Sequence, residues 1–304
     1  MFSQNQILSQ IFPNDSVLKF FIRSCASLLE GFNKHKVFYI WWGRGNNAKT
    51  LMQRLISSTL GNYSTTLPTS LITGRRGRST EATPDMHLAK SKLVVFLQEP
   101  NPEEKIQVGR IKELTGNDEV YVRELFKSGT NMKFKAKIVI VTNSYLDAPG
   151  MDSAFSKRVV VVPFESTFTD EKKNGNDKYY FPLDPDIENK IFRYRSVFMR
   201  MILEGYEVFK ERGLEVPDYI KAKTSEYITF NNYPLKFIKK TLRRDPLHSM
   251  DVESMYDDFK EWINRSYPRT KIPSIEALLT ELMYEEDFNV VDGVVEGVTS
   301  QYNF

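Results

Sequence analysis

The residues best suited to do chemistry lie in one short run, Gly43-Arg44-Gly45-Asn46-Asn47-Ala48-Lys49-Thr50. A loop of small residues between a strand and a helix can wrap its N–H groups around phosphates, while a lysine reaches the β- and γ-phosphates and a threonine hydroxyl ligates Mg²⁺. The run matches the pattern G-x-x-x-x-G-K-S/T except at Ala48, where glycine is usual. Alanine tolerates a positive φ poorly, at a cost of roughly 1 kcal/mol. A plain strand–turn–helix junction with an exposed lysine is therefore the alternative interpretation.

Three weaker signals follow this loop along the chain. An apolar strand ends at Glu99, where a carboxylate can polarise an attacking water and help to hold Mg²⁺. A second apolar strand ends at Asn143, whose amide can orient water against a terminal phosphate. Arg158 precedes a third and could reach the phosphate of a neighbouring subunit. Each signal alone has an ordinary explanation, namely a solvated glutamate, a turn asparagine and a surface arginine, but their order within 43–158 favours one nucleotide site.

Composition excludes several classes of protein. The chain has 304 residues, enough for one large domain or two modest ones. Its 21 Phe and 15 Tyr and its net charge of +3 argue against disorder, and any nucleic-acid binding must come from local basic patches. A single cysteine, Cys25, and three scattered histidines argue against disulfides and against a Cys- or His-ligated metal. With no membrane-length apolar run and no signal peptide, we expect a soluble, intracellular protein that does not contact membranes.

An α/β sheet is expected to position these residues. Buried β-branched runs alternate with helical periodicity, which is typical of a mainly parallel sheet that is covered on both faces. The expected strands are 37–42, 93–97, 138–141 and 159–162, and the expected helices are 4–33, 49–60 and 103–115. The pair Trp41-Trp42 is expected to pack in the core.

The pattern changes after residue 184. A long amphipathic helix is expected over 185–212, and several helices with one late strand pair, around 289–298, follow it. We therefore expect an N-terminal helical segment (1–36), a core (37–215) and a C-terminal, mostly helical domain (216–304).

Basic residues gather on an expected hairpin between two of the motifs. Its strands are 120–126 and 132–141, and Gly129 in the joint favours a turn. Lysines suit phosphate contact without base reading, and the hairpin carries Lys127, Lys133, Lys135 and Lys137. A solvated edge hairpin with protective lysines is the alternative. A second basic run, Arg75-Arg76-Gly77-Arg78, is interpreted first as a surface loop and second as a contact with DNA or a neighbouring subunit.

Taken together, these motifs resemble the superfamily 3 helicases, within the AAA+ ATPases. The chain is most similar to the primase-helicases of nucleo-cytoplasmic large DNA viruses (poxviruses, asfarviruses, iridoviruses) and to related phage and plasmid primase C-terminal domains. The resemblance covers roughly residues 5–285 and is weaker beyond 215. Its most diagnostic part is I-K-E-L-T-G-N-D-E-V-Y-V-R at 111–123, and the other matching segments are Gly43–Thr50, Leu93–Glu99, Thr142-Asn143 and Asp152–Phe164. The departures are Ala48 and Gln98, the latter standing where paired-acid versions have their first acid.

The resemblance implies an AAA+ P-loop core followed by a winged-helix-like C-terminal unit. It implies ATP and Mg²⁺ as cofactors and a homo-oligomeric ring, typically a hexamer, with ATP between subunits and single-stranded or forked DNA in the channel. Arg158 would then act in trans, whereas Lys49, Glu99 and Asn143 would act in cis with Thr50 and Glu99 at the metal. The phosphate-binding residues would be Gly43, Gly45, Asn46, Asn47, Ala48, Lys49 and Thr50, and the DNA-binding residues Lys127, Lys133 and Lys135.

The same resemblance predicts a role in viral genome replication, at replication sites in the host cytoplasm or nucleus, and it allows for a primase domain on a longer chain. Two other functions stay open on the residues alone. One is a ring scaffold or DNA-loading adaptor with little hydrolysis, and the other is a P-loop kinase acting on a small molecule.

Overall fold

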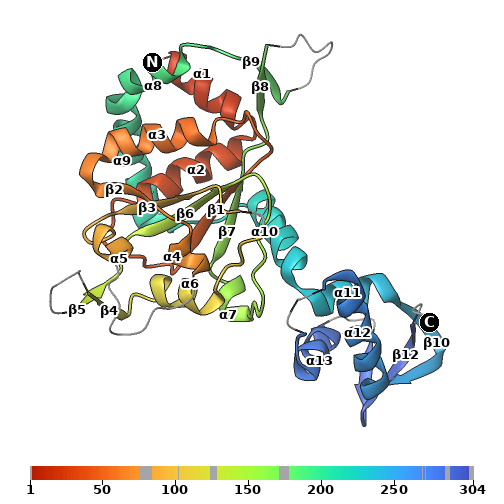
Figure 1. Cartoon of the computed structure of the whole chain (residues 1–304). Coiled ribbons are helices and arrows are strands. Elements are labelled where there is room, and N and C mark those ends of the chain that lie inside the picture. Colours follow the sequence, from red (N-terminus) through yellow and green to blue (C-terminus); the bar gives the residue numbers. More distant parts are fainter. Residues whose placement is uncertain are drawn as a thin grey trace. The chain divides into compact units, whose positions relative to one another are not determined.

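The computed structural model describes residues 2–74, 84–101, 103–123, 129–170, 178–268, 270, 272–284 and 288–300. The chain forms two compact units (Figure 1). Residues 1–147 and 152–225 make up the first, here called the core unit, and residues 148–151 and 226–304 make up the second, the C-terminal unit. No helix within the described ranges is long and apolar enough to cross a membrane.

The core unit is built on a five-stranded sheet whose neighbouring strands are all parallel. The strand order is β2-β3-β6-β1-β7. The bounds are β1 Phe38–Trp42, β2 Ser64–Leu67, β3 Val94–Gln98, β6 Lys137–Thr142 and β7 Val159–Pro163. The prediction of an α/β fold with a parallel sheet is thus confirmed, as are its four apolar strands. The fifth strand, β2, was not predicted because its sequence, S-T-T-L, is polar and only partly buried.

Helices cover both faces of this sheet, which explains why its strands are apolar on both sides. One face packs against α2 (Asp15–Ser27), α3 (Lys49–Leu60) and α9 (Arg195–Arg212), and in Figure 1 these three helices lie together above the sheet. The opposite face lies over α4 (Ser70–Thr73), α6 (Val108–Thr115) and α7 (Ser153–Ser156). Phe38 of β1, for example, packs against Phe155 of α7 with ring centroids 5.4 Å apart.

Several expected helices are shorter than their periodicity indicated. The region 4–33 forms two helices, α1 (Phe2–Ile11) and α2, because Pro13 interrupts the pattern and Asn14 caps α2 by accepting a 3.0 Å hydrogen bond from Ser16 N. The region 103–115 is helical only from Val108. The region 185–212 contains α8 (Ile187–Ile191), a 3-10 turn (Phe192–Tyr194) and then α9.

The basic hairpin is smaller than expected. It pairs β4 (Glu119–Val122) with β5 (Thr130–Lys133) in antiparallel register. The expected second strand, 132–141, is in fact divided between β5 and the core strand β6, because the chain turns into the sheet after Lys133 and buries Phe134 and Ala136. Two further elements of the core unit are α5 (Pro84–Leu88) and a small parallel pair, β8 (Thr167–Thr169) with β9 (Tyr180–Pro182).

The C-terminal unit begins within α10 (Asp218–Asn231) and combines three helices with an antiparallel sheet of order β10-β12-β11. Its helices are α11 (Tyr233–Thr241), α12 (Val252–Ser266) and α13 (Ile275–Tyr284), and its strands are β10 (Leu242–Asp251), β11 (Asn289–Val291) and β12 (Val294–Ser300). Phe237, Phe259 and Trp262 form the centre of its core. The late strand pair was predicted, whereas β10 was not, since its largely exposed sequence contains four charged residues and a proline.

Candidate nucleotide-binding site

The glycine-rich run forms the loop between β1 and α3. Its first residue has no room for a side chain, because a Cβ at Gly43 would overlap the carbonyl oxygen of Phe164 and the amide of Asn47. A Cβ at Gly45 would have no neighbour within 4 Å, so the loop is open on that side. The loop is thus held against the sheet at one end and open at the other.

Ala48 adopts the left-handed conformation that glycine usually supplies at this position. Its φ is 66° and its ψ is 15°, and it immediately precedes the first turn of α3. A left-handed conformation costs an L-residue about 1–2 kcal/mol. The loop therefore has the geometry expected of a phosphate-binding loop and carries backbone strain at the one position that departs from the pattern.

The side chain of Lys49 is folded back onto the loop and the neighbouring strand end. Its Nζ donates to Gly43 O at 2.7 Å, to Asn47 Oδ1 at 2.9 Å and to Asn143 Oδ1 at 2.9 Å. Burial lowers the pKa of this ammonium to about 8, while the Glu99 carboxylate acts in the opposite direction. All three acceptors are neutral, so the positive charge is not cancelled by an ion pair.

The carboxyl ends of three adjacent strands bring the other polar residues to the same place. Because β3, β6 and β1 are parallel neighbours, their following residues, Glu99, Asn143 and Gly43, lie at one edge of the sheet. Glu99 is exposed there and has a positive φ of 45°, and its backbone N–H donates to Val141 O at 3.0 Å. The structure thus brings Lys49, Thr50, Glu99 and Asn143 to one cavity.

Gln98 stands where paired-acid versions of this strand end have their first acid, and its side chain is hydrogen-bonded to Gln53. Its amide donates to Oε1 of Gln53, one turn beyond Lys49 on α3, and the Gln53 amide in turn donates to Thr66 Oγ1 at 3.1 Å. Gln53 is buried. This amide chain ties the end of β3 to α3 and β2 and leaves Glu99 as the carboxylate of this strand end that faces the cavity.

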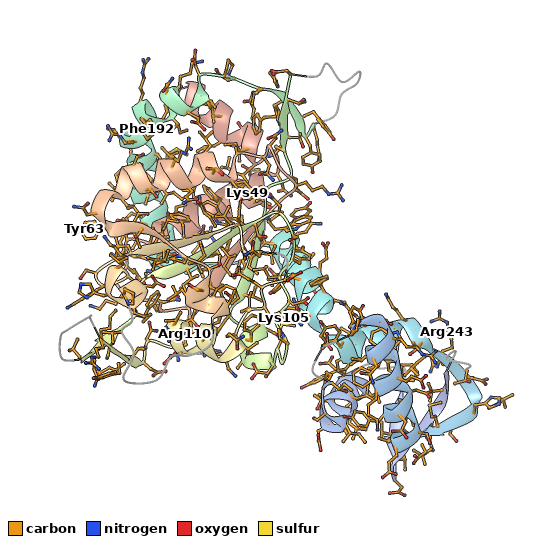
Figure 2. All side chains as sticks on the ribbon, in the orientation of Figure 1. Lys49, Tyr63, Lys105, Arg110, Phe192 and Arg243 are labelled. Atoms are coloured by element: carbon orange, nitrogen blue, oxygen red, sulfur yellow. The ribbon has the colours of Figure 1, made fainter. Side chains whose placement is uncertain are left out.

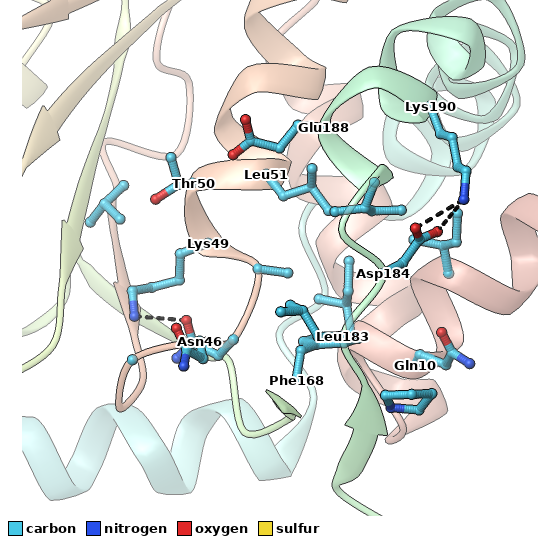
Figure 3. Close-up of a pocket in the computed structure, with 18 of the residues that line it drawn as sticks. Gln10, Asn46, Lys49, Thr50, Leu51, Phe168, Leu183, Asp184, Glu188 and Lys190 are labelled. Atoms are coloured by element: carbon cyan, nitrogen blue, oxygen red, sulfur yellow. Dashed lines mark hydrogen bonds and ion pairs between the residues drawn. The ribbon is translucent and has the colours of Figure 1, made fainter. Parts of the chain in front are cut away.

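The cavity measures about 760 Å³, within the usual range for small-molecule sites. Figure 3 shows Lys49 and Thr50 at one end, and Gln10, Phe168 and Leu183 at the other. The second end carries apolar side chains from α1, β8, the end of β9, α8 and the 3-10 turn that follows it, and the Asp184–Lys190 ion pair lies beside them. Sequence reasoning missed this end, because its residues are distant in the chain and have no common motif; they are Ile7, Ile11, Phe168, Pro182, Leu183, Ile187 and Tyr194.

Arg158 lies away from this cavity. It directly precedes β7, and the register pairs Phe38 with Val159, so Arg158 is beside the start of β1 while the loop follows its end. At about 3.3 Å per residue, Arg158 and the start of the loop at Gly43 are roughly 20 Å apart along the strand. Its Nη1 donates to Ala154 O at 2.5 Å, whereas its buried Nε has no hydrogen-bond partner among the residues described.

An ion pair braces the short helix that leads to Arg158. Lys112 Nζ lies 2.7 Å from Asp152 Oδ2, and Asp152 also caps α7 by accepting from Phe155 N at 2.8 Å. Burial alone would raise the pKa of Asp152, but the hydrogen bonds from Lys112 and Phe155 lower it overall. The segment 111–123 is therefore in direct contact with the segment Asp152–Phe164.

The lysines and arginines predicted to contact DNA differ in their exposure. Lys133, cross-strand from Glu119, and Lys135 are exposed, whereas Lys127 and the 75–78 run lie outside the described residues. The grouping of Lys137 with them was wrong. Lys137 is 3% exposed in β6 and donates to Glu30 O at 2.5 Å, and burial lowers its pKa to about 8.

The tryptophan pair divides between two environments. Trp41 is buried and contacts Phe21, Phe96 and Phe164, as expected of a core residue. Trp42 is partly exposed and stacks on Tyr145 with ring centroids 5.0 Å apart.

Comparisons with known proteins bear on this arrangement. A family of unknown function (DUF5906) matches residues 41–158. "Putative helicase 022R" of Frog virus 3 is 30% identical over 86% of this chain, and "Primase D5" of Fowlpox virus is 28% identical over 76% of it. "Putative primase C962R" of African swine fever virus is 24% identical over 76% of it. The chain spans 28%, 31% and 25% of these three relatives.

Solved structures show the same fold. The apo structure of the NrS-1 C-terminal region (305–718) superimposes with a TM-score of 0.57 at 16% identity, covering 92% of this chain and 61% of that one. The resemblance inferred from the motifs is therefore confirmed, since the relatives are helicase- and primase-named proteins of iridoviruses, poxviruses and asfarviruses.

Proposed function

We propose that this chain is the motor module of a viral replicative DNA helicase, which couples ATP hydrolysis to translocation on DNA as part of a ring. The observation that carries the proposal is the convergence of the loop, the Lys49 ammonium, Glu99 and Asn143 on one cavity with an apolar far end. The polar end of the cavity suits a triphosphate, and the apolar side chains at the other end suit a purine base.

The loop and Lys49 would bind the phosphates. Backbone N–H groups at the start of α3 favour anions. The Lys49 ammonium exchanges its neutral oxygen partners for phosphate oxygens when nucleotide enters. Because phosphate is charged, this exchange reverses the effect of burial and raises the pKa of Lys49.

Thr50 and Glu99 would hold Mg²⁺ together with the phosphates. Within the described ranges no group of three or more His, Cys, Asp or Glu side chains is arranged to bind a metal ion. Mg²⁺ suits this situation, because it keeps several waters and takes only one or two protein oxygens beside substrate phosphates. The exposed carboxylate of Glu99 would in addition polarise the attacking water, which Asn143 orients.

Arg158 would act on nucleotide bound to a neighbouring subunit. Its place at the opposite end of the strands keeps it from the cavity of its own chain. An arginine supplied in trans stabilises the charge that develops on the transferred phosphoryl group. The position of Arg158 therefore supports a ring in which each site is completed by the next subunit.

Lys133 and Lys135, with Lys127, would contact DNA. The first two are exposed on or beside the β4–β5 hairpin. Lysines contact phosphates without reading bases, as translocation along any sequence requires.

ATP hydrolysis with and without single-stranded DNA tests the proposal against its two alternatives. We expect hydrolysis that DNA stimulates and strand separation on a forked substrate. Hydrolysis near background with intact DNA binding would favour the scaffold or loading adaptor, and phosphoryl transfer to a small acceptor would favour the kinase. The matched control is Lys49→Ala beside Lys19→Ala, an exposed lysine on α2 that lies outside the cavity lining.

A further inference from the structure

Four cationic side chains lie close together in the sequence where α11 ends and β10 begins. They are Lys239, Lys240, Arg243 and Arg244, and all four are exposed. We call them the α11–β10 basic patch. Figure 2 labels Arg243 on the surface of the C-terminal unit.

The patch stands out because the unit around it is acidic. Residues 226–304 contain nine Lys and Arg but fourteen Asp and Glu. From Lys236 to Arg244, however, there are five cations and no acid. The positive charge of this unit is therefore concentrated in one short stretch of the chain.

Three cations of the unit that lie outside the patch have partners of their own. Lys260 pairs with Asp257 at 2.5 Å and Arg265 with Glu261 at 2.5 Å, both within α12. Lys236 lies over three aromatic rings, those of Phe230, Tyr233 and Tyr267, with Nζ between 4.5 and 5.2 Å from their centroids.

Lys240 and Arg243 differ from these residues. Across the described part of the chain, neither forms an ion pair with a carboxylate, and Arg243 Nη1 donates only to the carbonyl oxygen of its neighbour Leu242, at 3.2 Å. The carboxyl end of α11 favours cations in its last turn, but this effect does not extend to arginines on the following strand. Lys240 and Arg243 are therefore exposed cations that a polyanion can bind without displacing a carboxylate.

The helix that would enter a DNA groove in a winged-helix-like unit has the wrong charge for that task. In α13 the charged residues are Glu276 and Glu281, and there is no Lys or Arg. Contact with phosphates through α13 would be repulsive. The patch is the alternative, and it offers backbone contact without base reading.

We propose that the α11–β10 basic patch binds the phosphate backbone of DNA and gives the motor a second DNA contact, separate from the β4–β5 hairpin. The choice of DNA as the polyanion rests on the proposed function. The binding is independent of sequence and depends on salt, and Lys240 and Arg243 supply two phosphate contacts.

The test compares Lys240→Ala/Arg243→Ala with Lys260→Ala/Arg265→Ala in the full 304-residue chain. Both variants remove two cations from the same unit, but only the first removes cations without carboxylate partners. Fluorescence anisotropy with a labelled single-stranded oligonucleotide, and separately with a duplex, gives the dissociation constant between 50 and 200 mM NaCl.

We expect the patch variant to lose affinity and to flatten the log–log salt dependence by about 1.4 for single strands, the value for two phosphate contacts. The control should keep the parental slope. An unchanged slope in the patch variant, or an equal loss in the control, would overturn the proposal. If the alanine variant loses helix content, Lys240→Gln/Arg243→Gln repeats the measurement with longer side chains.

ATP hydrolysis without DNA, measured on the same samples, separates this proposal from the one on which it rests. A parental chain that hydrolyses no ATP refutes the motor while the binding comparison still decides the patch. Intact hydrolysis with an unchanged slope refutes the patch alone.

Discussion

The Nζ atom of Lys49 lies 2.9 Å from Oδ1 of Asn143, across 94 positions of the sequence. The contact joins the loop after β1 to the end of β6, which are adjacent parallel strands. The asparagine thus holds the lysine at the cavity. In the function proposed above, a phosphate that bound the lysine would free the amide of Asn143 to orient water. This hydrogen bond would then couple phosphate binding to the position of the Asn143 amide.

Lys49→Ala should abolish ATP hydrolysis and leave the fold intact. The variant removes the ammonium that neutralises phosphate charge, and it also removes the desolvation cost that lowers the pKa of Lys49 to about 8. Steady-state phosphate release measures hydrolysis and circular dichroism measures whether the fold is kept, with Lys19→Ala as the control. Near-parental hydrolysis by Lys49→Ala would show that the loop does not bind phosphates.

Ala48→Gly should stabilise the chain by up to about 1 kcal/mol, because glycine adopts the observed φ of 66° without strain. The control is Ala222→Gly, an exposed position inside α10, where the same change should destabilise by about 1 kcal/mol. Urea unfolding measures both. Destabilisation by Ala48→Gly would mean that the left-handed conformation is not strained.

Burial of Lys137 should make stability rise with pH. Because its pKa is lowered to about 8 in the folded chain and is near 10.5 when unfolded, the unfolded chain binds more protons between these values. The contribution is fully present above pH 10.5 and is lost as the pH falls through 8. Between pH 8 and 10 it amounts to about 2 kcal/mol. Urea unfolding at both pH values should show a smaller rise for Lys137→Met, and an identical rise would contradict the assignment.

Subunits carrying Arg158→Ala should recover activity when mixed with subunits carrying Lys49→Ala. Each variant alone should be inactive, since an arginine finger contributes about 10³-fold or more to the rate. In mixed rings some sites combine an intact lysine with an intact arginine. Hydrolysis as a function of mixing ratio measures the recovery. Mixed rings without any recovered activity would argue against a role in trans.

Lys133→Ala/Lys135→Ala should weaken DNA binding and unwinding while DNA-free ATP hydrolysis persists. Both lysines are exposed, and neither lines the cavity. The salt dependence for single strands should flatten by about 1.4, and Lys19→Ala/Lys34→Ala controls for the loss of two charges. Unchanged unwinding would show that other basic residues make the DNA contact.

The sequence by itself determined the polar end of the site. Gly43, Lys49, Glu99 and Asn143 each follow directly on an apolar strand or begin a helix, and parallel strands bring their carboxyl ends to one edge. Local pattern and chain direction are sufficient for that inference. The family resemblance followed from the order of these residues along the chain together with the segment 111–123, its most diagnostic part.

Tertiary structure alone decided the rest. The apolar end of the cavity combines Ile7, Phe168 and Ile187 from elements far apart in the chain, and such meetings leave no periodic signal. Lys137 has the sequence context of a hairpin lysine, yet β6 enters the sheet, where the Lys137 side chain is buried and donates to the Glu30 carbonyl oxygen. Strand β10 was missed because backbone pairing with β12, rather than apolar side chains, holds it in place. Long-range contacts depend on how elements pack, and packing is a property of the whole chain.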